Sequence, residues 1–420
     1  MRPLRLQTSG PRWRSLALVL WGTALLSGCA GDYVARTRGV RAAYESEQYD
    51  RALRELKQVE RQGVPRDRLL VLLDQGMLLH AAGYWQQSNQ VLEQADQLAA
   101  ELDAVSVSEE AGALLTNERE RAYRGEDFEK LMIPVLQALN YAQLGQDEDA
   151  LVEVRRVNER LEKMIHDEAR PYEQLAIARY IGGTLYEDQK EWDSAFIDYM
   201  KAYELEPNLG PLAEPLLRLA KKTGREDDYE RLRKRFPDVP HAPLGPGEGQ
   251  VVVVVEAGLS PEKEPADRYV GRERNLIQVP VYRDRGWTRL AQVRVGERVA
   301  RTVEVTSLAE VAKVHLNDRI GRLLAKQTAA LLVKGGLAVG AGVATKSEEV
   351  AALTFLLLNA MNQPDLRSWL SLPASFQLTR FRLPAGRHTV QVEGISGPQG
   401  ARQVEVQPGR VHVLVFRRYD

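Results

Sequence analysis

The stretch Gly183–Pro207, GTLYEDQKEWDSAFIDYMKAYELEP, decides how the first half of the chain folds. Its apolar residues recur at spacings of three and four with charged residues between them, which is the pattern of two amphipathic helices. Small residues let the two helices approach closely, aromatic residues fill the groove between them, and a proline ends the second helix. The positions that define this unit are Gly183, Tyr186, Ala195, Tyr199, Ala202 and Pro207.

The offsets of these six positions resemble those of a tetratricopeptide repeat. Weaker copies of the unit surround the anchor positions Ala52, Ser88 and Ala150, so that the steps to Ala195 are irregular instead of a constant 34 residues. We therefore expect a degenerate α-solenoid of such helix pairs over residues 29–236. Solenoids of this kind bind partners on the concave surface that the first helix of each pair lines.

The second half of the chain changes pattern after a linker that alternates proline and glycine, residues 237–249. Five consecutive valines from Val251 predict a central strand that is buried on both faces. Shorter candidate strands are Leu276–Tyr282, Arg289–Val295, Arg301–Val305, Thr389–Glu393, Gln403–Val406 and Val411–Phe416. We expect residues 250–420 to form a β-sandwich-like domain, with the last three strands as a meander and a bulge near Arg380, where the apolar phase slips.

An apolar helical insertion at 308–362 interrupts these strands, and its glycine- and alanine-rich part is 331–344. Its uncharged runs are shorter than the roughly 20 residues that cross a bilayer. We therefore expect a helical hairpin packed on the sheet, with contact between 331–361 and lipid or neighbouring copies as the alternative. Gly340–Ser347 falls one residue short of a phosphate-binding loop and follows a helix instead of a strand, so no nucleotide cofactor is expected.

Charge and composition exclude several classes of function. The 420 residues include 57 Lys and Arg against 58 Asp and Glu, so no bulk positive field favours nucleic acid. One cysteine and six scattered histidines give no metal site, and no catalytic motif for an enzyme is present. The charge is uneven, with −12 on residues 29–240 and +7 on residues 241–420, which also permits the two regions to pack on each other.

The N-terminus reads as an export signal. Four arginines precede an apolar run of about 11 residues, which is too short for a spanning helix. Gly28 and Cys29 follow this run. These residues resemble the lipobox of bacterial lipoproteins. The resemblance implies that the chain is cleaved between Gly28 and Cys29, which removes residues 1–28. It also implies that Cys29 is acylated, with palmitate among the acyl chains. Ala30 after the cysteine implies transport to the outer membrane, with most of the chain in the periplasm.

Two short motifs are more specific than simple packing requires: one follows the valine strand and the other precedes a late strand. Their distinctive residues are Gly258, Pro261, Lys263, Arg367, Trp369 and Pro373. We expect Arg367 and Trp369 to form a cation–π pair or a carboxylate-bound pair that closes the domain. The alternative is that the six residues only shape two strand connections.

Together with the lipobox and the degenerate repeats, these motifs resemble an uncharacterised family of bacterial outer-membrane lipoproteins. Members are often encoded beside a lipoprotein similar to penicillin-binding-protein activators. The resemblance implies an accessory role in the cell envelope with an envelope protein as partner. We expect a non-enzymatic adaptor that docks a protein on its repeats. One alternative is a structural subunit of an export or surface-polymer assembly that uses segment 331–344. Another is a hydrolase that acts on peptidoglycan or a surface glycan, which a pocket with two carboxylates at catalytic separation would support.

Overall fold

The computed structural model describes residues 33–109, 121–167, 175–270, 275–321, 364–395 and 397–420. Gly28, Cys29 and the segment 322–363 lie outside these ranges, and so do the phosphate-loop-like stretch and the glycine-rich run. Within the described ranges, no helix combines the length and the hydropathy needed to cross a bilayer.

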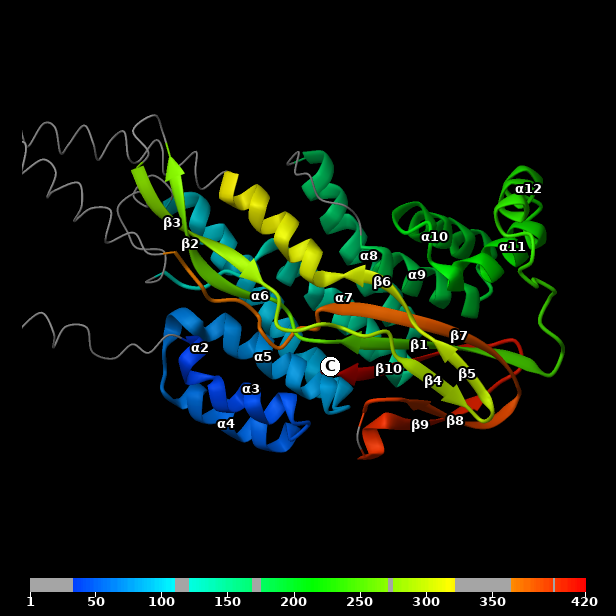
Figure 1. The fold of residues 1–420 in the computed structure, drawn as a ribbon, viewed down its shortest axis with the longest axis horizontal. Helices are drawn as coiled ribbons and strands as arrows, with labels where there is room; N and C mark the ends of the chain where they lie inside the picture. Colours follow the sequence, from blue (N-terminus) through cyan, green and yellow to red (C-terminus); the bar gives the residue numbers. More distant parts are fainter. Residues whose placement is uncertain (1–32, 110–120, 168–174, 271–274, 322–363, 396) are drawn as a thin grey trace, which may run out of the picture.

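Helices fill the described chain up to residue 235, and successive helices pack as pairs in a curved array (Figure 1). After the short α2 (Tyr33–Arg36), the pairs are α3 (Arg38–Glu45) with α4 (Tyr49–Arg61), α5 (Arg68–Ala81) with α6 (Trp85–Glu109), α7 (Asp127–Leu144) with α8 (Asp147–Glu162), α9 (Ala176–Asp188) with α10 (Trp192–Leu205), and α11 (Ala213–Lys222) with α12 (Glu226–Arg235). Short turns of helix are η1 (Pro65–Asp67), η4 (Lys163–Asp167), η5 (Gly210–Leu212) and η6 (Gly397–Gly400). We call the first members of the pairs the inner helices and the second members the outer helices.

The described strands of the second half form two four-stranded sheets and a separate hairpin. Sheet A has the order β10 (Val411–Arg418), β1 (Glu248–Ala257), β7 (Ser375–Pro384) and β6 (Val303–Ser307). Sheet C has the order β5 (Arg298–Arg301), β4 (Gln292–Val295), β8 (Gly386–Val392) and β9 (Ala401–Val406). The hairpin consists of β2 (Glu262–Val270) and β3 (Asn275–Arg283). The prediction of a helical first half and a sheet-bearing second half is confirmed.

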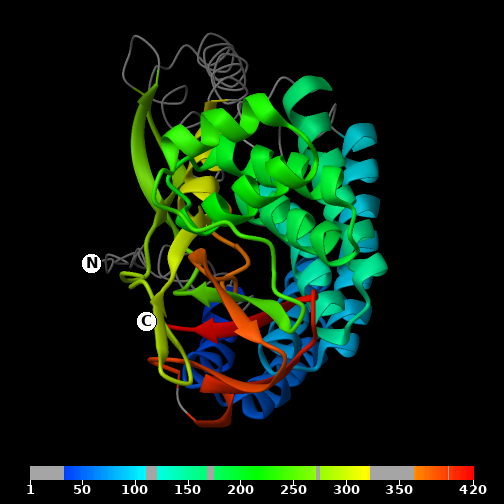
Figure 2. The ribbon, with the colours of Figure 1, turned by 90° about the vertical axis from the view of Figure 1, so that its right-hand side faces the viewer.

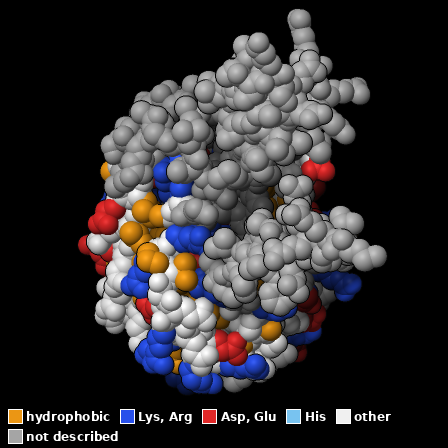
Figure 3. Space-filling model, turned by 90° about the vertical axis from the view of Figure 1, so that its left-hand side faces the viewer, with side chains coloured by type: hydrophobic (Ala, Val, Ile, Leu, Met, Phe, Trp, Pro, Cys, Tyr) orange, Lys and Arg blue, Asp and Glu red, His pale blue; other side chains and the backbone are white. Residues whose placement is uncertain are grey.

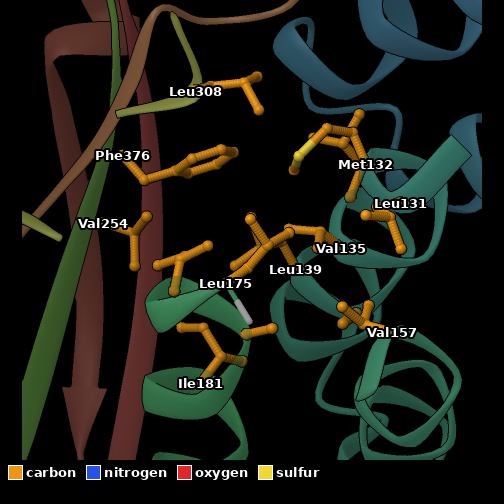
Figure 4. Close-up of a cluster of buried hydrophobic side chains, with 14 of the residues drawn as sticks. Leu131, Met132, Val135, Leu139, Val157, Leu175, Ile181, Val254, Leu308 and Phe376 are labelled. Atoms are coloured by element: carbon orange, nitrogen blue, oxygen red, sulfur yellow. The ribbon is translucent and has the colours of Figure 1, made fainter. Parts of the chain in front are cut away.

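The valine run is the central strand of the molecule, as its composition predicts. β1 lies between β10, to which it is parallel, and β7, to which it is antiparallel. Because successive side chains on a strand alternate in direction, Val252 and Val254 enter the core shared with the helices, and Val251, Val253 and Val255 enter the core between sheets A and C. In Figure 4, Val254 points from β1 toward Leu139 of α7.

The molecule is therefore layered as helices, sheet A and sheet C (Figure 2). The outer face of sheet A is covered by the helices, so sheets A and C do not form a free-standing sandwich. The helical region and the strand region share one continuous hydrophobic core, to which α7 contributes Leu139 and β7 contributes Phe376.

Two expectations about the strands are wrong. The last three strands do not form a meander, because β8 and β9 pair in sheet C while β10 crosses to sheet A. The pairing of β7 with β1 runs without a shift through Arg380, and the irregularity lies on β6 between Glu304 and Thr306. The apolar phase slips at Arg380 because β7 is buried on both faces, and Arg380 turns toward the acidic Glu187 on the helical side.

The linker and the insertion are tied to the body of the protein. Arg382 on β7 donates to the carbonyls of Ala242 (2.9 Å) and Pro243 (2.5 Å), so this part of the linker lies against the sheet. Residues 308–321 are helical, and Leu308 and Leu316 of the predicted apolar stripe are buried. The rest of the predicted hairpin falls outside the described residues.

Candidate functional site

The repeat-defining residues lie at the contact of α9 with α10. A Cβ built on Gly183 would lie 2.6 Å from the ring of Tyr199, so the close approach of the helices requires glycine there. A Cβ built on Gly76 of α5 would likewise lie 2.5 Å from the side chain of Leu92 on α6. Ala195 and Ala202 are fully buried, Tyr186 is half-buried, and Pro207 is exposed just beyond the end of α10.

The concave surface of the helical array, where we expected a partner, is occupied by the protein's own sheet A. Each inner helix reaches the sheet through a polar side chain. These contacts join Tyr44 to Arg417, His80 to Glu256, Gln143 to the Val413 carbonyl, Glu187 to Arg380, and Glu214 to Gln250. A peptide therefore has no open concave face to bind over this part of the chain.

The strongest of these contacts centres on Glu187 of α9. Its carboxylate accepts from Arg380 of β7 at 2.6 Å, from Arg218 of α11 at 2.5 Å and from the Tyr199 hydroxyl at 2.9 Å. Burial alone would raise the pKa of the Glu187 carboxyl, but the two guanidinium groups lower it to about 2. The carboxylate is therefore held ionised between two helices and the sheet.

A second buried contact joins β1 to α5 and α7. His80 lies between Asn140, at 2.6 Å from Nδ1, and Glu256, at 2.9 Å from Nε2. The atoms that face the imidazole nitrogens are both oxygens, Oδ1 of Asn140 and Oε1 of Glu256. All three side chains are fully buried, so the contact fixes the sheet at one register on the inner helices.

The structure brings the two sequence motifs together. The Ser260 amide donates to the Leu372 carbonyl at 2.7 Å, and Lys263 donates to the Arg367 carbonyl at 2.9 Å. Lys263 also donates to Glu126 at the start of α7. We call this meeting point of residues 258–263, 365–373 and the start of α7 the motif junction.

Arg367 connects the motif junction to the N-terminal helices. Its guanidinium donates to Asp365 at 2.7 Å and to Asp67 at 2.9 Å, and it lies over the ring of Tyr123 at 5.4 Å. The backbone amide of Trp369 donates to Glu129 at 2.6 Å, and its indole is fully buried. Pro261 and Pro373 are buried beside the two strand connections.

Two carboxyl groups at the motif junction have opposite pKa shifts. Burial raises the pKa of Glu129 to about 7. Burial would raise the pKa of Glu126 as well, but the charges of Arg319 and Lys263 bring it well below its ordinary value. Glu126 and Glu129 also form the capping box of α7, in which each side chain accepts from the other's backbone amide. The junction therefore has the features of a structural clamp.

Gly258 links the motif junction to the surface. Its φ of +68° suits glycine, and a Cβ there would lie 2.2 Å from the side chain of Thr288. Thr288 belongs to residues 284–291, which we call the Trp287 loop. This loop, Gly258 and the C-terminal residues line a pocket of about 330 Å³.

The pocket's acidic groups are paired with cations. Lys313 donates to Asp284 and to Glu310, each at 2.8 Å, and these hydrogen bonds raise the pKa of Lys313. Asp420 accepts from Arg418, which lowers the pKa of the Asp420 carboxyl. No cluster of three or more metal-ligating side chains occurs within the described ranges.

Sequence reasoning missed Glu187, Glu256, Arg380 and Trp287. Two of them had a signal: Glu256 ends an otherwise apolar run, and Arg380 stands at the phase slip. A charge inside a buried strand implies a buried partner, which here comes from a helix distant in sequence.

No protein-family model matches the chain, and no curated protein matches it. Solved structures match about half of it. The crystal structure of MamA protein is 13% identical and covers 50% of this chain and 97% of that chain, with a TM-score of 0.33. MamA from Desulfovibrio magneticus RS-1 is 18% identical, covers 50% and 94%, and has a TM-score of 0.33. A tetratricopeptide repeat protein from Parabacteroides merdae is 19% identical, covers 47% and 64%, and has a TM-score of 0.31. Likeness at TM-scores of this size does not extend to function.

Proposed function

We propose that this protein is a lipid-anchored, non-enzymatic scaffold of the bacterial outer membrane that binds an envelope protein on its outer helices. The lipobox-like sequence that ends at Gly28 and Cys29 supports the anchor. A place in the periplasm follows from that anchor and from the resemblance of the N-terminus to an export signal.

Because sheet A fills the concave face, the partner needs another surface of the helical array. Sheet A covers the inner helices and is held there by buried contacts such as the ion pair of Glu187 with Arg380. Breaking a buried ion pair of this kind costs about 3–5 kcal/mol. A partner would have to displace the sheet to reach the inner helices. The outer helices remain as the exposed part of the helical array.

The observation that carries the proposal is a repeated pair of exposed side chains on two outer helices. Val152 on α8 and Ile197 on α10 are 44% and 45% exposed, and each follows its repeat's anchor alanine by two residues. Each is preceded, four residues earlier, by an exposed acid, Glu148 or Asp193. Residues four apart lie on one helix face, so an acidic and an apolar group recur together.

The two outer helices lie close enough for one partner to contact both. A Cβ on Gly182 of α9 would lie 2.4 Å from Asp198 of α10 and 2.9 Å from Val154 of α8. α8 and α10 therefore pack on the same part of α9. The chemistry that fits this surface is a protein with exposed apolar and cationic side chains, because the helical region carries a charge of −12.

The test is affinity purification of the lipidated protein from crosslinked envelopes. We compare the wild type with the double variant Val152→Asp, Ile197→Asp, and use Tyr84→Asp as a matched control at an equally exposed apolar position between α5 and α6. One envelope protein should be lost from the double variant and kept by the control. An unchanged set of captured proteins would contradict the outer-helix site, and detergent-resistant self-association alone would favour the structural-subunit alternative.

A further inference from the structure

Trp287 is the most exposed large hydrophobic residue within the described ranges, with 93% of its surface accessible. An almost wholly exposed tryptophan keeps a large apolar surface in water, and its ring suits an interface that is apolar on one side and wet on the other. Its loop is fixed on both sides. Arg285 donates to the carbonyls of Ser260 (2.7 Å) and Leu370, and Asp284 accepts from Lys313. The exposed indole is therefore presented by an ordered loop.

Basic and apolar residues surround the indole along the chain. Residues 283–301 contain six arginines and two acids, and all of these arginines except Arg285 are exposed. Leu290 and Val299 in this stretch are each more than one third exposed. On another side of the molecule, the end that carries β2 and β3, Lys and Arg side chains also lie beside hydrophobic ones (Figure 3). Exposed tryptophan with surrounding cations is the combination that contacts the interface of a bilayer with anionic lipid.

The place of the N-terminus favours a bilayer over a protein partner. Tyr33 donates to Asp74 at 2.7 Å, and Ser371 donates to the same carboxylate at 2.6 Å. Ser371 follows Leu370, whose carbonyl accepts from Arg285 of the Trp287 loop. The four residues from Cys29 to Tyr33 reach at most about 14 Å. An acylated Cys29 would therefore keep this part of the protein next to the membrane.

We propose that the Trp287 loop and the exposed arginines of residues 283–301 form a second membrane contact, which rests the protein on the anionic phospholipid surface that holds its lipid anchor. This proposal deepens the proposed function and rests on it for the acylation of Cys29. With the Trp287 loop on the bilayer, the outer helices are left available to a periplasmic partner.

The first test uses the lipidated full-length protein in vesicles of phosphatidylethanolamine and phosphatidylglycerol with brominated acyl chains. The mature chain has four tryptophans: Trp85, Trp192, Trp287 and Trp369. Bromine quenches only an indole at the bilayer, so quenching in the wild type should exceed that in Trp287→Phe about twofold or more. Equal quenching in vesicle-bound wild type and variant would overturn the second contact and leave the anchor standing.

The second test removes the anchor, so that the two proposals can fail separately. The full chain with Cys29→Ser is mixed with the same vesicles, and binding is measured by co-sedimentation at low and high salt. Arg289→Glu should weaken binding at low salt about fivefold or more, Trp287→Ser should also weaken it, and the control Ile197→Ser should not. Binding that is absent, or that ignores Trp287 and Arg289, would overturn the contact. A wild type without acyl chains by mass spectrometry would overturn the anchor alone.

Discussion

At the scale of single residues, the helical array depends on glycines that admit a neighbouring side chain. The ring of Tyr199 lies over Gly183, and its hydroxyl is held by Thr184 at 3.2 Å and by Glu187 at 2.9 Å. The ring therefore cannot move away from an added methyl group. We expect Gly183→Ala to lower the free energy of unfolding by about 1–3 kcal/mol, the usual cost of overpacking.

Urea denaturation followed by circular dichroism measures this change. The matched control is Gly210→Ala, where an added Cβ meets nothing within 4 Å. That variant should stay within about 0.5 kcal/mol of the wild type. Equal stability of the two variants would contradict the close-approach explanation of Gly183.

Glu187 gives a second residue-scale prediction, which concerns pH. Its folded pKa of about 2 is below the unfolded value, so its contribution to stability is present above pH 4.5 and is lost as pH falls toward 2. Glu187→Gln should therefore be less stable than the wild type at neutral pH by several kcal/mol, because Arg380 and Arg218 lose a charged partner. The difference should shrink as pH falls below 4.5.

Unfolding free energies from urea titrations at pH 7, 5 and 3 test this. Glu405→Gln is the control, because Glu405 and Arg387 form an exposed pair at 3.7 Å that contributes little. A gap between the wild type and Glu187→Gln that stayed constant with pH would show that the Glu187 charge does not stabilise the fold.

At the scale of elements, residue patterns and turn chemistry predicted where the strands lie better than they predicted which strands are adjacent in a sheet. The valine run correctly predicted β1, because a strand buried on both faces needs apolar residues at every position. The turn at Pro408–Gly409 wrongly suggested that β9 and β10 are adjacent. Residues 407–410 instead pack on Gly249, where a Cβ would lie 2.4 Å from the Gln407 carbonyl, and this places β10 beside β1. Such packing between distant segments leaves no local signal.

The motif junction shows the same limit at the candidate site. Sequence reasoning selected Lys263 and Arg367 as unusual residues, and the structure joins them in one cluster. Their acidic partners, Glu126 and Asp67, could not be predicted, because a carboxylate that begins a helix has the same local pattern whether it faces solvent or a buried cation. The exposure of Trp287 was likewise invisible, since an indole in a loop is buried or exposed according to what packs on that loop.

At the scale of the whole molecule, the opposite charges of the two halves are met in the structure by ion pairs across their contact. Arg380 with Glu187 and Arg410 with Asp188 join the basic strands to the acidic helices. The charge difference permitted this packing but did not specify it, because the same charges also fit two independent domains that bind separate partners. The continuous core of α7, β1 and β7 distinguishes these cases.

That shared core predicts one cooperative unfolding transition for the helices and the strands together. Val253 is fully buried between sheets A and C, away from the helices, so Val253→Ala should lower stability by about 1–3 kcal/mol through a defect in the strands alone. All measurements use a background in which Trp85, Trp192 and Trp287 are replaced by Phe, so that Trp369 alone fluoresces after residue 28. If the two regions unfold together, this defect must shift the helical transition, followed by far-ultraviolet circular dichroism, and the fluorescence transition of buried Trp369 by the same amount. The exposed Val152→Ala should shift neither. A helical midpoint unmoved by Val253→Ala would mean that the helices fold alone and hold sheet A as a replaceable ligand, and the concave face would again be a surface open to partners.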